Sequence, residues 1–286
     1  MENASDFYSF RHGRFDITML SDGPIMLGGE IFAPEGTDQQ RDDILSRLKG
    51  DHSGAAAQSN IPLIITDEDL ILIDVGAGNK FQASEGRLEE NLKSVGVGAK
   101  DITAVIISHA HPDHLWGLLK ADNSLRFPNA RYFIGRKEFD FWTGPDAAAL
   151  PEGMQQFVDG ARRDLLAIAD IATFFEDGGE IIRGIRAIAT PGHTAGHSSF
   201  LLEGDIPLIV TVDAIASEIV SVEHPEWSFG FDMDVGLAEK TRSSLLQRVS
   251  SENAKLIGFH WSYPGVGRIA FDGTAYTFQS ATGTAE

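Results

Sequence analysis

The stretch from Ala104 to Gly117 constrains the fold of this chain more than any other. An apolar run of strand character ends at Ser108, and His109, His111, Asp113 and His114 follow within six residues. Two histidines that are two positions apart in extended chain can point the same way. The proline before Asp113 suits the first turn of a helix, where its missing N–H costs little. The pattern therefore predicts a junction between a strand and a helix that is lined with metal-ligand side chains.

Three more apolar runs lead to a candidate metal ligand farther along the chain, at His193, Asp213 and His260. Because neighbouring strands end at a shared edge of a sheet, we expect these side chains to meet those of the first stretch. The seven candidate ligands are His109, His111, Asp113, His114, His193, Asp213 and His260. Seven ligands exceed what one tetrahedral ion takes, so they predict two ions, with the Asp213 carboxylate as the natural bridge.

Composition limits the kind of metal site and the kind of partner. The 286 residues include no cysteine, which excludes thiolate ligands and leaves a nitrogen and oxygen set suited to zinc, or to manganese, iron or cobalt. The 42 Asp and Glu outnumber the 23 Lys and Arg and give a net charge of −19, which argues against a nucleic-acid partner.

The sequence also bears on where the protein is located in the cell. Residues Met1–Asp6 lack the basic and apolar regions of a signal peptide, and no apolar run approaches the roughly 20 residues of a membrane span. We therefore expect a cytoplasmic protein with no membrane partner.

The predicted elements favour one domain over residues 1–286, without the strict alternation of strand and helix that a Rossmann fold requires. Residues 25–60 look like an insertion or lid. Helical patterns cover 37–49, 84–95, 154–171 and 235–250, with Ser84 and Asp234 as candidate N-caps. Residues 268–278 are expected to form a strand at the sheet edge.

Two motifs resemble a known family. His109-Ala-His111-Pro-Asp113-His114 matches the HxHxDH signature of the metallo-β-lactamase superfamily, and Pro191-Gly-His193-Thr-Ala-Gly-His197 matches its PGHTxGH segment. The resemblance runs from about Phe15 to Arg268 and implies an α/β fold, a four-layer αββα sandwich of two mixed sheets. It also implies a dinuclear site, in which His109, His111 and His193 hold one metal and Asp113, His114 and His260 hold the other, with Asp213 between them.

Within that superfamily the chain is most similar to the branch of methyl parathion hydrolase and the acyl-homoserine lactonases. The segment Gly258–Gly267 carries much of this resemblance, which implies a small neutral ester, lactone or organophosphate as substrate and a homodimer as the assembly. Some lactonases of the branch carry a tyrosine three residues after the bridging aspartate, where this chain has Ala216.

Several other residues receive a predicted role. Trp116, Phe229, Phe231, Trp261 and Tyr263 are candidates to line an apolar substrate pocket, with plain core packing as the alternative. Asp74 and His197 are expected to orient ligand histidines or to make packing contacts.

The chemistry expected of such a site is hydrolysis by a hydroxide that bridges two ions, with Asp113 as the catalytic residue that orients it and passes a proton to the leaving oxygen. Two alternatives stay open from the sequence. One is a phosphodiesterase or nuclease, which would require a local basic groove. The other is a metal-binding sensor that lacks turnover.

Overall fold

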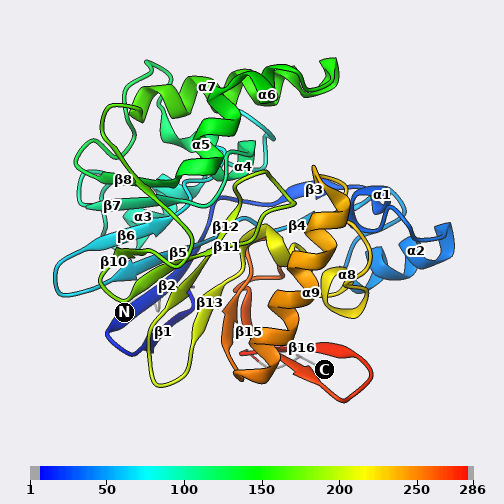
Figure 1. Cartoon of the computed structure of the whole chain (residues 1–286). Coiled ribbons are helices and arrows are strands. Elements are labelled where there is room, and N and C mark those ends of the chain that lie inside the picture. The colour runs from blue at the N-terminus through cyan, green and yellow to red at the C-terminus, as the bar shows by residue number, and fades with distance from the viewer. Residues whose placement is uncertain (1–6, 283–286) are drawn as a thin grey trace. The chain divides into compact units, whose positions relative to one another are not determined.

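The computed structural model describes residues 7–282 (Figure 1), so Met1–Asp6, which bear on the signal-peptide prediction, lie outside the described residues. The chain forms two compact units. The first unit contains the chain up to Gly23 and Ser59–Glu176, and the second contains Pro24–Gln58 and the chain from Asp177 onward. Nearly all of the predicted insertion at 25–60 thus belongs to the second unit. Its role as a lid stays a prediction.

The first unit is built on a seven-stranded mixed sheet in the order β1-β2-β5-β6-β7-β8-β9. Its strands are β1 Ser9–His12, β2 Phe15–Ser21, β5 Asn60–Ile65, β6 Leu70–Ile73, β7 Ala104–Ile107, β8 Arg131–Gly135 and β9 Ala172–Phe175. Strands β6 to β9 pair in parallel, and β7 is buried along its whole length. A parallel strand covered on both faces takes a continuous apolar sequence, which accounts for the run that precedes His109.

The helices of the first unit follow its parallel strands. They are α3 Leu88–Ser94, α4 Pro112–Leu115, α5 Arg136–Thr143, α6 Pro145–Ala148 and α7 Gln155–Ile168, with short 3₁₀ turns at Trp116–Leu118 and Glu152–Met154.

The second unit is built on another seven-stranded mixed sheet, in the order β10-β11-β12-β13-β14-β15-β16. Its strands are β10 Glu180–Ile182, β11 Ile185–Ala189, β12 Ser198–Leu202, β13 Leu208–Val210, β14 Lys255–Ile257, β15 Val266–Phe271 and β16 Tyr276–Ser280. Strands β13 and β14 pair in parallel. The two large mixed sheets confirm the predicted α/β class. They also divide the predicted ligands, because His109 follows a strand of one sheet while His193, Asp213 and His260 follow strands of the other.

The second unit contains further elements besides that sheet. They are the small hairpin of β3 Ile25–Leu27 and β4 Ala55–Ala57, the helices α1 Gly29–Phe32, α2 Asp38–Arg47, α8 Val220–Glu223 and α9 Val235–Ser251, and a 3₁₀ turn at Val212–Ile215.

The core of the second unit forms where α9 packs on its sheet. Leu245, Leu246 and Val249 of α9 cluster with sheet residues such as Ile209, and Trp261 belongs to the same cluster. Trp261 is fully buried at 0% exposure, and its indole N–H donates to the Ile215 carbonyl at 2.8 Å. Trp261 therefore packs in this core, as the core-packing alternative expects, and its role in binding a substrate stays a prediction.

Local rules predicted some element boundaries and missed others. Asp234 caps α9 as expected, by accepting a hydrogen bond from the Leu237 amide. The helix expected from Ser84 begins instead at Leu88, because the distant Asp22 carboxylate accepts the amide hydrogen bonds of Gly86 and Leu88.

Two further differences concern α7 and the C-terminal strand. Helix α7 covers Gln155–Ile168 and gives way to β9, and the expected strand at 268–278 is the hairpin of β15 and β16. Among residues 7–282, no helix combines the length and the apolar character needed to cross a bilayer.

Candidate metal centre

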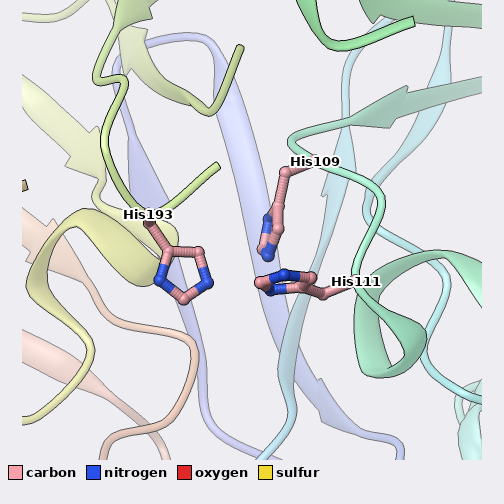
Figure 2. Close-up of side chains that lie close together, drawn as sticks. All are labelled: His109, His111 and His193. Atoms are coloured by element: carbon pink, nitrogen blue, oxygen red, sulfur yellow. The ribbon is translucent and has the colours of Figure 1, made fainter. Parts of the chain in front are cut away.

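The first unit brings four predicted ligands together at the end of β7. His109 follows the strand, His111 is the N-cap of α4, and Asp113 and His114 lie in that helix. The ring centres of His109 and His111 are 4.8 Å apart, and those of His109 and His114 are 4.0 Å apart. Figure 2 shows the imidazoles of His109 and His111 close to one another. All four side chains are buried, so they are held by packing.

Asp74 fixes the orientation of this group. It lies just after β6 with a φ of 66°, and its Oδ2 accepts hydrogen bonds from His114 Nδ1 at 2.8 Å and from the Ser108 hydroxyl at 2.7 Å. The Ser108 hydroxyl also lies 3.0 Å from His109 Nδ1. A carboxylate bound to Nδ1 holds an imidazole with Nε2 presented to a metal, which is the geometry that the predicted role of Asp74 requires.

Sequence reasoning missed two carboxyl groups near these ligands. Glu138 of α5 is buried and accepts hydrogen bonds from the Ala110 amide at 2.9 Å and from the Trp142 indole at 2.7 Å, so it fixes the turn between His109 and His111. Burial, and then the charge of Asp113, raise the pKa of Glu85 to about 8. No sequence signal marks either residue, because both depend on contacts between distant segments.

The second unit brings together the other three predicted ligands. Oδ2 of Asp213 lies 3.2 Å from His193 Nε2 and 3.2 Å from His260 Nε2. The Nδ1 atoms of both histidines bind oxygen atoms, at 3.0 Å from Asp232 Oδ1 for His193 and at 2.9 Å from the Gln58 carbonyl for His260. One carboxylate oxygen between two imidazoles is the arrangement expected of a bridging ligand.

His197 supports Asp213 through the backbone. Its Nε2 accepts a hydrogen bond from the Asp213 amide at 3.2 Å, so its Nδ1 carries the proton and donates to the Thr190 hydroxyl at 2.8 Å. Both ring nitrogens are therefore engaged. This arrangement suits a residue that holds a ligand in place rather than one that binds metal.

Asp232 is a further residue that the sequence did not reveal. Besides His193 Nδ1, its carboxylate accepts hydrogen bonds from the Phe229 amide at 2.9 Å and from the Arg242 guanidinium at 2.7 Å. Burial raises the pKa of Asp232, but the hydrogen bond from His193 and the charges of His193 and Arg242 outweigh it, so that this pKa lies below its usual range. Burial lowers the pKa of His193, yet Asp213 and Asp232 together raise it to about 9.

The donor set fits divalent metal ions. Two ligands at about 2.0–2.1 Å from a tetrahedral ion lie about 3.3 Å apart. The 3.2 Å separations around Asp213 match this value, as does the 3.3 Å between His114 Nε2 and Asp113 Oδ2 in the first unit. Buried imidazole and carboxylate donors of this kind suit zinc, manganese, iron or cobalt, and the identity of the metal stays open.

The predicted pocket residues differ in their surroundings. Phe229 is buried with its ring centre 6.2 Å from those of both His193 and His260, so it lies against the ligands of the second unit. Trp116 packs against Phe81 and Phe157 of the first unit, with ring centres 6.0 and 6.3 Å away.

The other two predicted pocket residues outside the core are Tyr263 and Phe231. Tyr263 is 38% exposed, and Phe231 packs against Phe229 with ring centres 5.8 Å apart. The role of Trp116, Phe229, Phe231 and Tyr263 in binding a substrate stays a prediction.

The chain is similar to several known proteins. The chain is 31% identical over 137 residues to the N-acyl homoserine lactonase AttM of Agrobacterium fabrum, a match that covers 44% of this chain and 46% of the relative. It is 29% identical over 233 residues to a probable metallo-hydrolase of Methanocaldococcus jannaschii, covering 79% of this chain and 95% of the relative. The matched region thus spans about half the length of AttM lactonases such as this one.

Two solved structures resemble nearly the whole chain. One is AidC, a dizinc quorum-quenching lactonase in complex with a product, with a TM-score of 0.88 at 29% identity and 98% coverage of both chains. The other is the hydrolase AbOPH of the β-lactamase superfamily, with a TM-score of 0.88 at 27% identity and the same coverage. The family model of the metallo-beta-lactamase superfamily matches residues 54–260, a range that holds all seven predicted ligands. The chain therefore belongs to the metallo-beta-lactamase superfamily.

Proposed function

We propose that this chain is a dinuclear metal-dependent hydrolase that opens the ring of a small acylated lactone. The observation that carries the proposal is the set of buried imidazole and carboxylate donors, held at separations that suit a metal ion. The likeness to AidC over 98% of both chains supports a lactone as substrate ahead of an aryl ester or an organophosphate triester. A homodimer also stays part of the proposal.

In this proposal, the seven predicted ligands hold one pair of ions. Among the described residues, three groups of buried donor side chains could each hold an ion. They are His109 and His111 with His193, His109 and His114 with Asp213, and Asp113 and His114 with His260. Figure 2 draws the first of these groups. Zinc is the metal proposed first, because the donors are imidazoles and carboxylates with tetrahedral separations.

The reaction then follows from the roles of the side chains. A bound pair of divalent ions would lower the pKa of a water molecule and polarise the lactone carbonyl. Asp113 is proposed to accept the proton of the attacking water. The ester C–O bond of the ring breaks after the new C–O bond has formed, and Asp113 returns the proton to the leaving ring oxygen, so that the product is a hydroxy acid.

The test combines metal analysis with a substrate panel. We expect about two ions per chain after purification in zinc-containing buffer. We also expect hydrolysis of an N-acyl homoserine lactone that exceeds hydrolysis of an aryl ester, a phosphotriester, a β-lactam and bis-nitrophenyl phosphate. His109→Ala and Asp113→Ala should lower kcat/KM by at least 100-fold, on the order of what metal ligands and proton-transfer groups contribute. His52→Ala, which changes an exposed histidine, is the matched control.

Three results would count against the proposal. Protein free of metal after this purification would remove the dinuclear site. Two bound ions without turnover of any substrate would favour a metal-binding sensor. Preference for bis-nitrophenyl phosphate would favour a phosphodiesterase.

A further inference from the structure

Arg242 is the most buried cation of α9, and its position needs an explanation. The residue is 1% exposed in a chain that otherwise keeps its charged side chains mostly at the surface. One guanidinium nitrogen donates to the Pro225 and Trp227 carbonyls, and another donates to Asp232 Oδ2 at 2.7 Å. A buried guanidinium is costly to desolvate unless its partners are placed to receive it, so this set of acceptors is a built site.

The acceptor Asp232 connects Arg242 with a predicted metal ligand. Its Oδ2 receives the guanidinium and the Phe229 amide, while its Oδ1 lies 3.0 Å from His193 Nδ1. Both side chains of the Asp232–Arg242 pair are buried. The guanidinium and the Phe229 amide hold the carboxylate through Oδ2, and Oδ1 holds the imidazole of His193, whose Nε2 faces Asp213.

The loop at 225–232 also joins these residues to α1 and its neighbours in the second unit. The Gly230 amide donates to the Ile31 carbonyl at 2.8 Å, and the Ser228 hydroxyl donates to Glu35 at 2.8 Å. Arg242 holds the start of this loop through its two carbonyl acceptors. The loop is thus held by hydrogen bonds both to Arg242 and to residues 31 and 35. Asp232 therefore has little freedom to follow His193 if the imidazole rotates.

We propose that Arg242 and Asp232 are positioning residues that set the metal affinity of His193, with Arg242 acting through Asp232. The proposal rests on the proposed metal-dependent function. Removal of the Asp232 carboxylate frees the ring of His193 and leaves Arg242 without its charged partner. Removal of the guanidinium frees Asp232 to move away from Nδ1. Either change is expected to weaken the binding of the ion that His193 holds and to leave the binding of the other ion unchanged.

The experiment measures zinc affinity by competition with a chromophoric chelator, in the absence of substrate. Asp232→Asn is expected to lower the affinity for one of the two ions by about 10–100-fold, the usual effect of losing a residue that orients a ligand. Arg242→Lys keeps the charge but cannot reach all three acceptors, and it should weaken the same ion. Asp234→Asn is the matched control, because Asp234 lies two residues away and caps α9 without a bond to His193.

A double variant separates positioning from independent structural effects. If Arg242 acts through Asp232, then Asp232→Asn combined with Arg242→Lys should bind zinc no more weakly than the weaker-binding of the two single variants. Circular dichroism of each metal-free variant shows whether it folds. Cobalt bound in place of zinc has an absorption spectrum that reports the ligand field of the ion. A merely structural role of Asp232 and Arg242 would leave this spectrum unchanged, whereas a positioning role would change it.

The outcomes distinguish this inference from the proposed function. Wild-type affinity in Asp232→Asn, or effects of the two single variants that multiply in the double variant, would overturn the positioning role alone. Normal zinc binding by the wild type without lactone hydrolysis would overturn the proposed function and leave this inference standing. Wild-type protein that binds no zinc would overturn both.

Discussion

At the scale of single residues, four of the five predicted ligand histidines share one feature. Nδ1 of His109, His114, His193 and His260 each lies within hydrogen-bond distance of an oxygen atom. These oxygens belong to a hydroxyl, two carboxylates and a backbone carbonyl. Each partner selects the tautomer that presents Nε2 as the metal donor. The chemistry of the site therefore depends as much on these oxygen atoms as on the histidines themselves.

A second residue-scale feature is the buried carboxyl of Asp22, whose pKa burial raises from 3.8 to about 6 against three backbone hydrogen bonds. An acid whose folded-state pKa is raised holds its proton better when folded. The corresponding stability is fully present below pH 3.8 and is lost as the pH rises through about 6. Over that range the shift corresponds to about 3 kcal/mol.

We expect Asp22→Asn to remove this pH dependence. The free energy of unfolding, measured by denaturant titration with chelator present, should fall between pH 4 and pH 6.5 more steeply in the wild type than in the variant. The variant should also be about 1–3 kcal/mol less stable near pH 5, because an amide NH₂ cannot accept the backbone N–H hydrogen bonds that both side-chain oxygens of Asp22 accept. Parallel pH profiles of the two proteins would contradict this assignment.

At the scale of elements, the turn at 190–193 is shaped by its contact with α9. Gly192 has a φ of 126°, and a Cβ built there would lie 2.2 Å from the Ala238 amide nitrogen. The Thr241 hydroxyl of α9 donates to the Pro191 carbonyl at 2.7 Å. The glycine thus lets the turn approach the helix backbone and carries His193 to Asp213. The segment from Pro191 to His193 therefore packs on α9 in addition to its predicted metal role.

The variant Gly192→Ala should therefore lose both stability and metal binding. We expect a loss of about 2–4 kcal/mol in the free energy of unfolding, because the clash is with backbone atoms and the φ is unfavourable for alanine. Zinc affinity should fall as well, since His193 is the next residue.

Gly236→Ala is the matched control for this change. It lies in the first turn of the same helix, where a Cβ meets nothing closer than Asp234 Oδ1 at 3.9 Å. It should raise stability by up to about 1 kcal/mol, through helix propensity. Thermal unfolding and chelator competition measure both effects, and equal behaviour of the two variants would show that the close approach at Gly192 is unimportant.

At the scale of the whole molecule, the predicted ligands are shared between two compact units, each with its own mixed sheet. Four ligands come from the first unit and three from the second. If the proposed site binds ions with ligands from both, then metal binding favours the folded form of both at once. A ligand that binds the folded state alone stabilises it by about 2.7 kcal/mol at a hundred times its Kd.

We accordingly expect the unfolding temperature to rise with zinc concentration and to fall after chelation, as measured by scanning calorimetry. The wild type should show a single transition with zinc present. His109→Ala should respond to zinc much less than the wild type, and His52→Ala should respond equally. An unfolding temperature that is insensitive to zinc in the wild type would contradict the shared site.

Short-range rules account for the features that could be predicted from the sequence. The apolar run before His109 predicts a buried strand, Pro112 predicts the start of a helix, and Asp234 predicts the cap of α9; the structure has all three. The spacing of the histidines predicted the donor types for the same reason, because residues two apart in extended chain share a face.

The partners of those residues depend on tertiary packing. Asp22 accepts a hydrogen bond from Leu88 at the start of α3, 66 positions away. Trp261 packs in the core of the second unit, and Asp232 binds His193, which lies 39 positions away in the sequence. No local pattern marks such pairs, because a buried polar group is satisfied by whichever distant segment packing brings within about 3 Å. The predicted metal ligands thus follow from local sequence patterns, whereas the groups that orient them depend on the packing of the folded chain.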